Sequence, residues 1–433
     1  MDTTVNRETD EAALADAVSE ERPTEWEPKR LRDLIKEINA GYSVKSEDRT
    51  IGDGEVGVLK VSAASYGIFQ PEEHKAVRSE EEENVKTSPR AGDIIMTRSN
   101  GTASLVGACA HVDQDYPNLY LPDTLWQIKV EDEVSARWLN YALASGRMRS
   151  RIRASSYGTS GMKKLSMKRL RSLEITVPLP GEQQRIADIL STWDRSIEQI
   201  GELIAAKERR KKALIQQLLK GKTRVPGATS QDWEEKRLGD YFEYFSNRNS
   251  EEEQLPVLSC SKVHGIIPQE EKFDKRVASK DTSNYKVVEE GDLVYDPMLL
   301  WDGSIGFVKG IQKGIVSPAY YTFKFKVDDL DQVFFEHLLE SHYVKYQYEA
   351  ISQGTNTRRQ KAPRQAFLGI KIEVPPREER HAIATILRKV GDELQMLREE
   401  RDALQRQKKG MMQKLLTGKI RVSTGFTSPQ VEA

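Results

Sequence analysis

Cysteine and histidine are scarce in this chain. Its 433 residues include only two cysteines, Cys109 and Cys260, which form no Cys-x-x-Cys pair, and six histidines. His337 and His342 lie five apart, which does not match the i, i+4 spacing of a helical metal pair. We therefore expect no metal site. So few cysteines are typical of the reducing cytoplasm.

Long apolar runs are also missing. No segment approaches the roughly 18 apolar residues of a membrane-spanning helix, and residues 1–24 lack the apolar part of a secretory signal. A charged fraction of 31% with a net charge of −1 is that of a soluble protein. We expect a cytoplasmic protein without a membrane partner.

Catalytic motifs are incomplete. Residues 221–223 resemble the end of a phosphate-binding loop, but Gln216 stands where that loop requires glycine. Residues 296–299 resemble the Asp-Pro-Pro-aromatic loop of amino-methyltransferases, but they lack the second proline and the aromatic residue. We predict a recognition protein that is not an enzyme.

One segment of the chain occurs twice. Residues 177–225 align with residues 374–422 without a gap, at a constant offset of 197, and 19 of the 49 positions are identical. The motif at residues 26–31 is likewise echoed at residues 233–238, ahead of the second copy. The chain is predicted to be a duplication, with a period far longer than that of a solenoid.

Each copy of the repeat is predicted to be a long helix, because prolines precede it and a glycine ends it. Apolar residues recur at alternating steps of four and three, the heptad pattern of a coiled coil. Lys207, Lys211, Arg401 and Lys408 interrupt this pattern. We predict an antiparallel pair that buries both apolar seams. The seam residues are Ile186, Leu190, Trp193, Ile197, Ile200, Ile383, Leu387, Val390, Leu394 and Leu397.

These features set the domain boundaries. We predict an acidic, disordered tail at 1–24, a globular region at 25–176, a helix at 177–224, a linker at 225–232, a second globular region at 233–373, a helix at 374–422 and a tail at 423–433. A docking helix through Leu14 and Val18 is the alternative for the first tail.

Both globular regions contain mostly strand and turn patterns, with helical segments near 136–153 and 331–350. The predicted fold class is α+β. Two β-rich domains with small helices are joined by two long helices that form an antiparallel coiled coil, in a pseudo-two-fold repeat.

Two stretches combine positive charge with an absence of acidic residues. Residues 134–173 hold ten Arg or Lys and no Asp or Glu, and residues 351–371 are also free of acids. Each stretch contains a polar glycine loop, at 157–161 and at 353–357. This recurrence predicts two polyanion-binding surfaces, and such loops suit phosphates and base edges. The alternative is a solvated helix face beside an ordinary loop.

The repeated helix opens with VP…EQ..IA.IL and closes with Q.LL.GK.RV, carried in the first copy by residues 177–190 and 217–225. With two variable domains, each followed by such a helix, the chain resembles the specificity subunit of type I restriction–modification enzymes. Residues 301–306 and 314–320 are similar to target-recognition domains of that family. The second copy has Arg380 in place of Gln183, and we expect weaker partner contacts there.

The resemblance implies a function and a set of partners. Each globular region would be a target-recognition domain that reads one half of a bipartite, asymmetric site in double-stranded DNA. The paired helices would hold the domains apart and dock two methyltransferase (modification) subunits. Restriction subunits would add translocation and cleavage. S-adenosylmethionine, ATP and Mg would belong to those partner subunits, and this chain would bind no cofactor.

For DNA contacts we select polar loop residues as base readers and neighbouring basic residues as phosphate contacts. The base readers are Tyr157, Thr159, Ser160, Asn356, Thr357, Arg98, Asn100, Thr102, Trp301 and Ser304. The phosphate contacts are Arg151, Arg153, Lys163, Lys164, Arg358, Arg359 and Lys361.

Two alternatives stay open at this point. One is a coiled-coil scaffold whose β-rich domains bind protein. The other is a specificity factor of a different methylation-based phage-defence system. DNA binding separates the first of these from the other hypotheses, and neighbouring genes separate the two defence systems.

Overall fold

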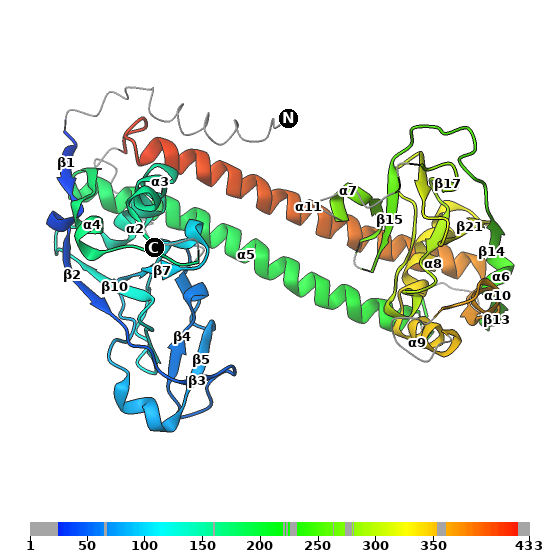
Figure 1. Cartoon of the computed structure of the whole chain (residues 1–433), viewed down its shortest axis with the longest axis horizontal. Coiled ribbons are helices and arrows are strands. Elements are labelled where there is room, and N and C mark those ends of the chain that lie inside the picture. The colour runs from blue at the N-terminus through cyan, green and yellow to red at the C-terminus, as the bar shows by residue number, and fades with distance from the viewer. Residues whose placement is uncertain are drawn as a thin grey trace, which may run out of the picture. The chain divides into compact units, whose positions relative to one another are not determined.

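The computed structural model describes residues 25–64, 67–158, 161–219, 221, 224–225, 232–262, 264–272, 279, 281–352 and 361–422. Internal contacts divide the chain into two compact units. Unit 1 runs through Gln199 and resumes at Arg401, and unit 2 is Ile200–Glu400. Each long helix therefore contributes one part to each unit (Figure 1). The predicted tails at 1–24 and 423–433 lie outside the described residues.

Unit 1 is built on a four-stranded antiparallel sheet in the order β2-β10-β6-β8, beside a second sheet in the order β3-β5-β4-β9. Its strands are β1 (Glu27–Arg30), β2 (Ile35–Ala40), β3 (Ser46–Glu47), β4 (Gly57–Leu59), β5 (His74–Val77), β6 (Ile94–Thr97), β7 (Ser99–Asn100), β8 (Cys109–His111), β9 (Leu119–Tyr120), β10 (Leu125–Val130), β11 (Lys163–Lys164) and β12 (Glu174–Val177). Its short helices are α2 (Ala136–Ala144), α3 (Gly146–Ser155), α4 (Met167–Ser172), and the 3-10 turns η1 (Leu31–Asp33), η2 (Val61–Ala64), η3 (Ser79–Asn84) and η4 (Ala103–Leu105).

Unit 2 repeats this plan. Its main sheet has the order β14-β21-β18-β19, and its second sheet has the order β16-β15-β20-β17. The strands are β13 (Glu234–Arg237), β14 (Phe242–Phe245), β15 (Val257–Ser261), β16 (Gly265–Pro268), β17 (Lys286–Glu289), β18 (Leu293–Tyr295), β19 (Ile305–Phe307), β20 (Lys313–Val316), β21 (Tyr321–Phe325) and β22 (Lys371–Val374). The short helices are α6 (Leu238–Tyr241), α7 (Gln269–Lys272), α8 (Asp329–Leu339), α9 (His342–Ile351), α10 (Arg364–Leu368) and the 3-10 turn η5 (Leu300–Asp302).

Strands β6 and β18 of the two main sheets are buried on both faces, which explains why they are short and mostly apolar. Successive side chains of a strand point to opposite faces. In β6, Ile94 and Met96 pack in the core that includes the helices, whereas Ile95 packs with the second sheet. In β18, Leu293 and Val294 divide in the same way. The predicted α+β class, with two β-rich domains, is confirmed.

The long helices are α5 (Pro180–Leu218) and α11 (Arg377–Leu415), of 39 residues each. In unit 1, Asp194 of α5 forms an ion pair with Lys408 of α11. In unit 2, Lys207 pairs with Glu393, and Arg398 Nη2 lies 2.6 Å from Glu208 Oε1. The pairing is antiparallel, as predicted, and acidic partners accommodate two of the lysines that interrupt the seam. None of the described helices is long and apolar enough to cross a membrane.

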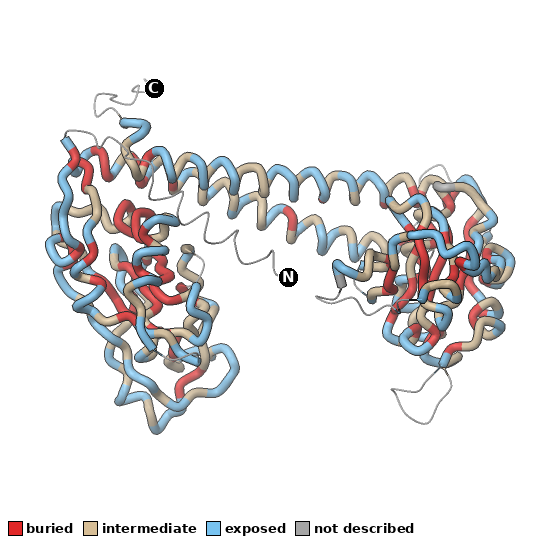
Figure 2. Tube along the Cα trace, turned by 45° about the horizontal axis from the view of Figure 1, so that its top comes forward, coloured by how far each residue is buried: buried red, intermediate tan, exposed pale blue. Residues whose placement is uncertain are grey.

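The predicted seam residues fall into two groups by burial. Those near the start of each helix lie in a domain core: Ile186, Leu190, Ile383 and Leu387. Farther along, Leu394 is buried, and the others are half-buried: Trp193, Ile197, Ile200, Val390 and Leu397. Outside the domain cores each long helix packs only against the other, so the flanks of its apolar seam stay partly exposed. Figure 2 shows the buried positions of both helices gathering where they meet a domain.

A buried carboxylate ties three segments of unit 1 together. Glu182, in the first turn of α5, accepts hydrogen bonds from Trp26 Nε1 at 2.8 Å, Arg421 Nε at 2.8 Å and Arg421 Nη2 at 3.1 Å. Its side chain is 2% exposed. The tryptophan precedes the first strand, and the arginine follows the end of α11. We call this set the carboxylate clasp.

Unit 2 contains the same clasp at equivalent positions. Glu379 accepts from Arg224 Nε and Nη2, both at 2.8 Å, and from Trp233 Nε1 at 3.3 Å. Here the arginine follows the end of α5. The sequence motifs that echo one another at residues 26–31 and 233–238 therefore share a physical role, because each supplies the indole donor of a clasp.

We predict that the clasp makes the stability of unit 1 sensitive to acid. Burial by itself would raise the pKa of Glu182, but hydrogen bonds from Arg421 and Trp26 hold it below its ordinary value of 4.5. The resulting stability is complete above that ordinary value and is lost as the pH falls through the lower pKa of the folded state. Glu182→Gln should lower the free energy of unfolding by about 1–3 kcal/mol at neutral pH, as measured by urea unfolding.

The difference between wild type and Glu182→Gln should shrink in acid. Glu202→Gln, at an exposed position of the same helix, is the matched control and should have little effect. A difference that stays constant across the acid range would show that the carboxylate charge does not stabilise the clasp.

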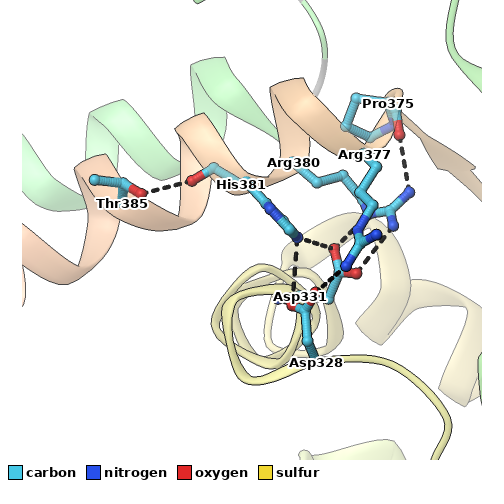
Figure 3. Close-up of polar contacts among 7 residues, drawn as sticks. All are labelled: Asp328, Asp331, Pro375, Arg377, Arg380, His381 and Thr385. Carbon is cyan, nitrogen blue, oxygen red and sulfur yellow. Dashed lines mark hydrogen bonds and ion pairs between the residues drawn. The ribbon is translucent and has the colours of Figure 1, made fainter.

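The residue that follows each clasp glutamate, Gln183 or Arg380, also joins its helix to the adjoining domain. Gln183 does so through backbone groups and Arg380 through an ion pair. Gln183 Oε1 accepts from Ser135 N at 3.0 Å, and its Nε2 donates to Pro178 O at 2.9 Å. In unit 2, Arg380 Nε and Nη2 donate to the two oxygens of Asp331 at 2.7 and 3.1 Å, and Nη1 donates to Pro375 O at 3.2 Å (Figure 3).

This geometry corrects the expectation for Arg380. Its side chain is 10% exposed, and that of Asp331 is 1% exposed. Gln183 is also buried. Both side chains form their hydrogen bonds inside their own unit, which leaves them little exposed surface for a partner. The second domain compensates for the arginine with an aspartate.

Asp328, Asp331 and His381 come close enough for one ligand atom of each to share a metal ion. Both oxygens of Asp331 already accept from Arg380, and Arg377 Nη2 lies 2.5 Å from Asp328 Oδ2. A cation would compete with two guanidinium groups for these carboxylates. The cluster in Figure 3 is therefore an ion-pair network.

We predict strong coupling between Asp331 and Arg380. Either Arg380→Gln or Asp331→Asn alone leaves a buried charge unpaired and should cost about 3 kcal/mol or more, whereas the double variant removes both charges and should cost less than the sum. Unfolding free energies of the four proteins give the coupling directly. Additive costs would mean that the pair contributes nothing beyond its separate contacts.

Candidate nucleic-acid interface

Two of the predicted DNA-contacting segments of unit 1 are adjacent in space. Strands β7 and β11 pair so that Lys163 faces Asn100 and Lys164 faces Ser99. Tyr157 continues this pairing, since its N–H donates to Lys164 O at 2.9 Å and its carbonyl accepts from Lys164 N at 2.8 Å. Residues 98–102, 157–158 and 161–164 thus form one surface, which we call the β7–β11 patch.

A glycine is required at the turn of this patch. Gly158 has φ +126°, and a Cβ atom there would lie 2.2 Å from Met162 O. Lys163 Nζ donates to Gly158 O at 3.0 Å, which holds the turn from the other side. The predicted readers Thr159 and Ser160 follow this glycine and lie outside the described residues.

The side chains of the patch offer varied polar groups. Tyr157 is 44% exposed, with the Arg169 guanidinium 5.0 Å from its ring centroid. Asn100 Oδ1 accepts from Thr102 N at 2.8 Å, which fixes the orientation of its amide. Arg98 is half-buried, 5.9 Å from the Trp126 ring. Hydrogen-bonding groups held in fixed orientations suit the reading of base edges.

Several arginines of the acid-free stretch bind the protein itself. Arg151 Nη1 donates to Glu174 O at 2.5 Å, and Arg153 Nη2 donates to Ser150 Oγ at 3.2 Å. Arg149 and Arg171 donate to backbone carbonyls in the same way. Some of the arginines that the sequence assigned to polyanion binding therefore bind strands and helices of unit 1 itself. Lys164 remains exposed on the patch.

The predicted residues of unit 2 are more dispersed. Trp301 Nε1 donates to Met298 O at 3.1 Å, within η5 and its preceding turn. Ser304 is 4% exposed, so its assignment as a base reader is wrong, because a buried hydroxyl cannot reach a base. Lys361 is exposed. Four further predicted residues lie outside the described residues: Asn356, Thr357, Arg358 and Arg359.

Equivalent backbone contacts relate the two surfaces. In unit 1, Leu165 N donates to Arg98 O at 2.9 Å, and in unit 2, Ala362 N donates to Pro297 O, also at 2.9 Å. Lys164 and Lys361 precede these donors. Both contacts come just after the third strand in the order of the main sheet, β6 or β18, so Lys361 takes the place in unit 2 that Lys164 has in the β7–β11 patch.

Sequence reasoning missed a cationic and aromatic cluster in unit 2. The Arg364 guanidinium lies 4.1 Å from the ring centroid of Tyr244, and Lys286 Nζ lies 5.7 Å from the same centroid. Burial alone would raise the pKa of Tyr244, but Ser246, Lys286 and Arg364 hold it below its usual value. The segments are far apart in the sequence, and no local pattern links them.

Comparisons with known proteins agree on one family. The family model described as the type I restriction modification DNA specificity domain matches residues 23–208 and 230–406. The putative type I restriction enzyme MjaX specificity subunit of Methanocaldococcus jannaschii is 25% identical over 93% of this chain and 96% of its own length. The EcoKI specificity subunit of Escherichia coli is 22% identical over 45% of each chain.

Solved structures share the fold. The S subunit of a type I restriction–modification system from M. genitalium is similar with a TM-score of 0.55 and 15% identity, over 90% of this chain and 96% of that one. A structure reported on the assembly and conformational transition of the type I R-M system has a TM-score of 0.53 and 18% identity, over 92% and 100% of the two chains.

We predict that the turn at Gly158 maintains the β7–β11 patch. In Gly158→Ala, the new Cβ atom meets Met162 O, so the pairing of Tyr157 with Lys164 should be lost while the rest of the domain stays folded. The amides of both residues should then exchange hydrogen faster. Gly161→Ala is the matched control, because no atom lies within 4 Å of its Cβ position. Equal exchange rates in both variants would count against a required glycine.

Proposed function

This chain belongs to the type I restriction–modification DNA specificity family, and from that premise we propose that its two units each read one half of a bipartite DNA site. As a specificity subunit it supplies recognition and not catalysis. The observation that supports the proposal most directly is the β7–β11 patch, where polar side chains and lysines from two sequence segments share one exposed surface.

The two half-sites are expected to differ in sequence. The units share sheet order and clasp, but the corresponding loops carry different residues. Arg98 and Asn100 occupy one, whereas Pro297, Met298 and Leu299 occupy the other, and the last two are 37% and 40% exposed. Different side chains at equivalent positions would select different bases. The recognised site should therefore be asymmetric.

Roles follow from exposure and hydrogen bonding. We assign Tyr157, Asn100 and Thr102 to base contacts, with Arg98 held behind them. Lys164, Lys361 and the free nitrogens of Arg153 would contact phosphates. Trp301 stays a candidate reader. The residues outside the described ranges keep the roles given by the sequence: Thr159, Ser160, Asn356 and Thr357 for bases, and Arg358 and Arg359 for phosphates.

The partners would be two methyltransferase subunits that dock on the long helices, and restriction subunits that join them. The exposed polar faces of α5 and α11 outside the domain cores are suited to such docking. S-adenosylmethionine, ATP and Mg would be bound by those subunits. The chain would then work in the cytoplasm, where the DNA is.

Mapping of methylated adenines tests this proposal in the protein's own host. A strain with the gene should carry methyl groups at an asymmetric motif of two short half-sites separated by an unread spacer, and a strain without the gene should lack them. Asn100→Ala should relax the sequence preference in one half-site and leave the other unchanged. Thr417→Ala, at a residue outside the β7–β11 patch whose hydroxyl donates to Gln413 O, is the control.

Unchanged methylation in the deleted strain would remove the proposal and favour a protein-binding scaffold. A motif that is one continuous sequence, or an inverted repeat, would show that the two units do not read separate and different half-sites.

A further inference from the structure

Five side chains from four segments of unit 2 converge at one edge of its main sheet. Tyr244 is the third residue of β14 and Tyr321 begins the neighbouring β21, with ring centroids 6.1 Å apart. Arg364, the first residue of α10, stacks on Tyr244. Lys286 reaches the same rings from the second sheet, and Arg248 forms a backbone bridge with Lys286. We call this set the Tyr244 cluster.

The lysine of the cluster is placed where a charge is costly. Lys286 is 6% exposed, and its Nζ donates to the carbonyl oxygen of Tyr320. Burial lowers its pKa, the Tyr244 hydroxyl beside it opposes that effect, and the smaller influence of the positive charges of Arg248 and Arg364 lowers the pKa again, so that it lies below its ordinary value. The faces of Tyr244 and Tyr321, with centroids 5.7 and 5.6 Å away, attract the cation but cannot neutralise it.

Among the described residues, none of the three cations of the cluster has a carboxylate within ion-pair distance. Elsewhere in unit 2 lysines do have such partners. Lys313 Nζ lies 2.7 Å from Glu253, and Lys324 Nζ lies 3.0 Å from Asp292. Three gathered positive charges without a counter-charge raise the energy of the unbound protein. Binding of an anion would relieve that cost.

The position of the cluster indicates which anion. It lies on the side of the main sheet where Ala362 N, two residues before Arg364, donates to Pro297 O. This contact is the counterpart of the Leu165–Arg98 contact beside the β7–β11 patch. The guanidinium of Arg364 lies over the ring of Tyr244, and Arg248 is exposed and donates to Asn284 Oδ1 at 2.8 Å. Planar guanidinium groups with several donors match the geometry of a phosphate.

We propose that the Tyr244 cluster is a phosphate-binding site for the DNA backbone at the second half-site. The inference rests on the proposed function and names the residues by which unit 2 would bind the backbone of its DNA. Arg364 and Arg248 contact the phosphate, and Tyr244 holds the guanidinium of Arg364 in place. Lys286 is a positioning residue, because its nitrogen is bound to a carbonyl and its charge acts from beneath the rings.

Binding of the full chain to a labelled random-sequence duplex, measured by fluorescence anisotropy over a range of salt concentrations, tests the site. Arg364→Gln should weaken binding by about fivefold to tenfold and flatten the plot of log affinity against log salt by about one. Arg364→Lys keeps the charge and loses the stack, so it should preserve the slope and weaken binding less.

Two further variants guard against other causes. Arg248→Gln changes an exposed side chain and should flatten the slope without lowering the melting temperature, which keeps the test decisive if Arg364→Gln unfolds. Lys313→Gln removes the same charge from a lysine already paired with Glu253, and its slope should equal that of wild type.

The outcomes separate the two proposals. A wild-type chain whose DNA binding does not depend on salt would overturn the proposed function. Salt-dependent binding by wild type with unchanged slopes in both Arg364→Gln and Arg248→Gln would overturn the phosphate site alone. An equal loss of DNA affinity and of salt slope in Lys313→Gln would also overturn it, because the effect would then depend on the net charge of the protein and not on the position of the removed charge.

Discussion

The buried glutamate at the start of each long helix is the contact on which the rest of the structure depends. Glu182 and Glu379 accept hydrogen bonds from an indole before the first strand of a domain and from an arginine beyond the end of a long helix. A charge so deeply buried is tolerated only when all its partners are present. Each unit therefore needs its domain, the start of one helix and the end of the other, and neither domain is complete without both.

The clasp is the same in both units, but the adjacent junction is not. Gln183 bonds to backbone groups of Ser135 and Pro178, whereas Arg380 forms an ion pair with Asp331. A neutral amide can turn between donors and acceptors, but a buried guanidinium requires a carboxylate. Each domain is thus matched to the helix that follows it. An exchange of domains at the strand–helix boundary, with the helices left in place, would separate Asp331 from Arg380.

Positive charge has two uses in this protein, and only the structure distinguishes them. In the acid-free stretch of unit 1, Arg149, Arg151 and Arg171 donate to the backbone carbonyls of Val106, Glu174 and Ile35. Lys164 stays on the surface beside Asn100. In unit 2, Lys286 and Arg364 bring positive charge to the ring of Tyr244, outside the basic loop that the sequence indicated. A count of arginines locates a basic region but does not say which of them face a ligand.

The sequence by itself determined the duplication, the two long helices, their antiparallel seam, the α+β class and the family, because these features repeat at a fixed offset or follow a local period. It also placed Asn100, Tyr157 and Lys164 among the candidates. Only the tertiary structure decided that these three share a surface, that Ser304 is buried, that Arg380 faces Asp331, and that Tyr244, Lys286 and Arg364 form a cluster. Such facts depend on contacts between strands and helices distant in the chain, and a local pattern carries no information about them.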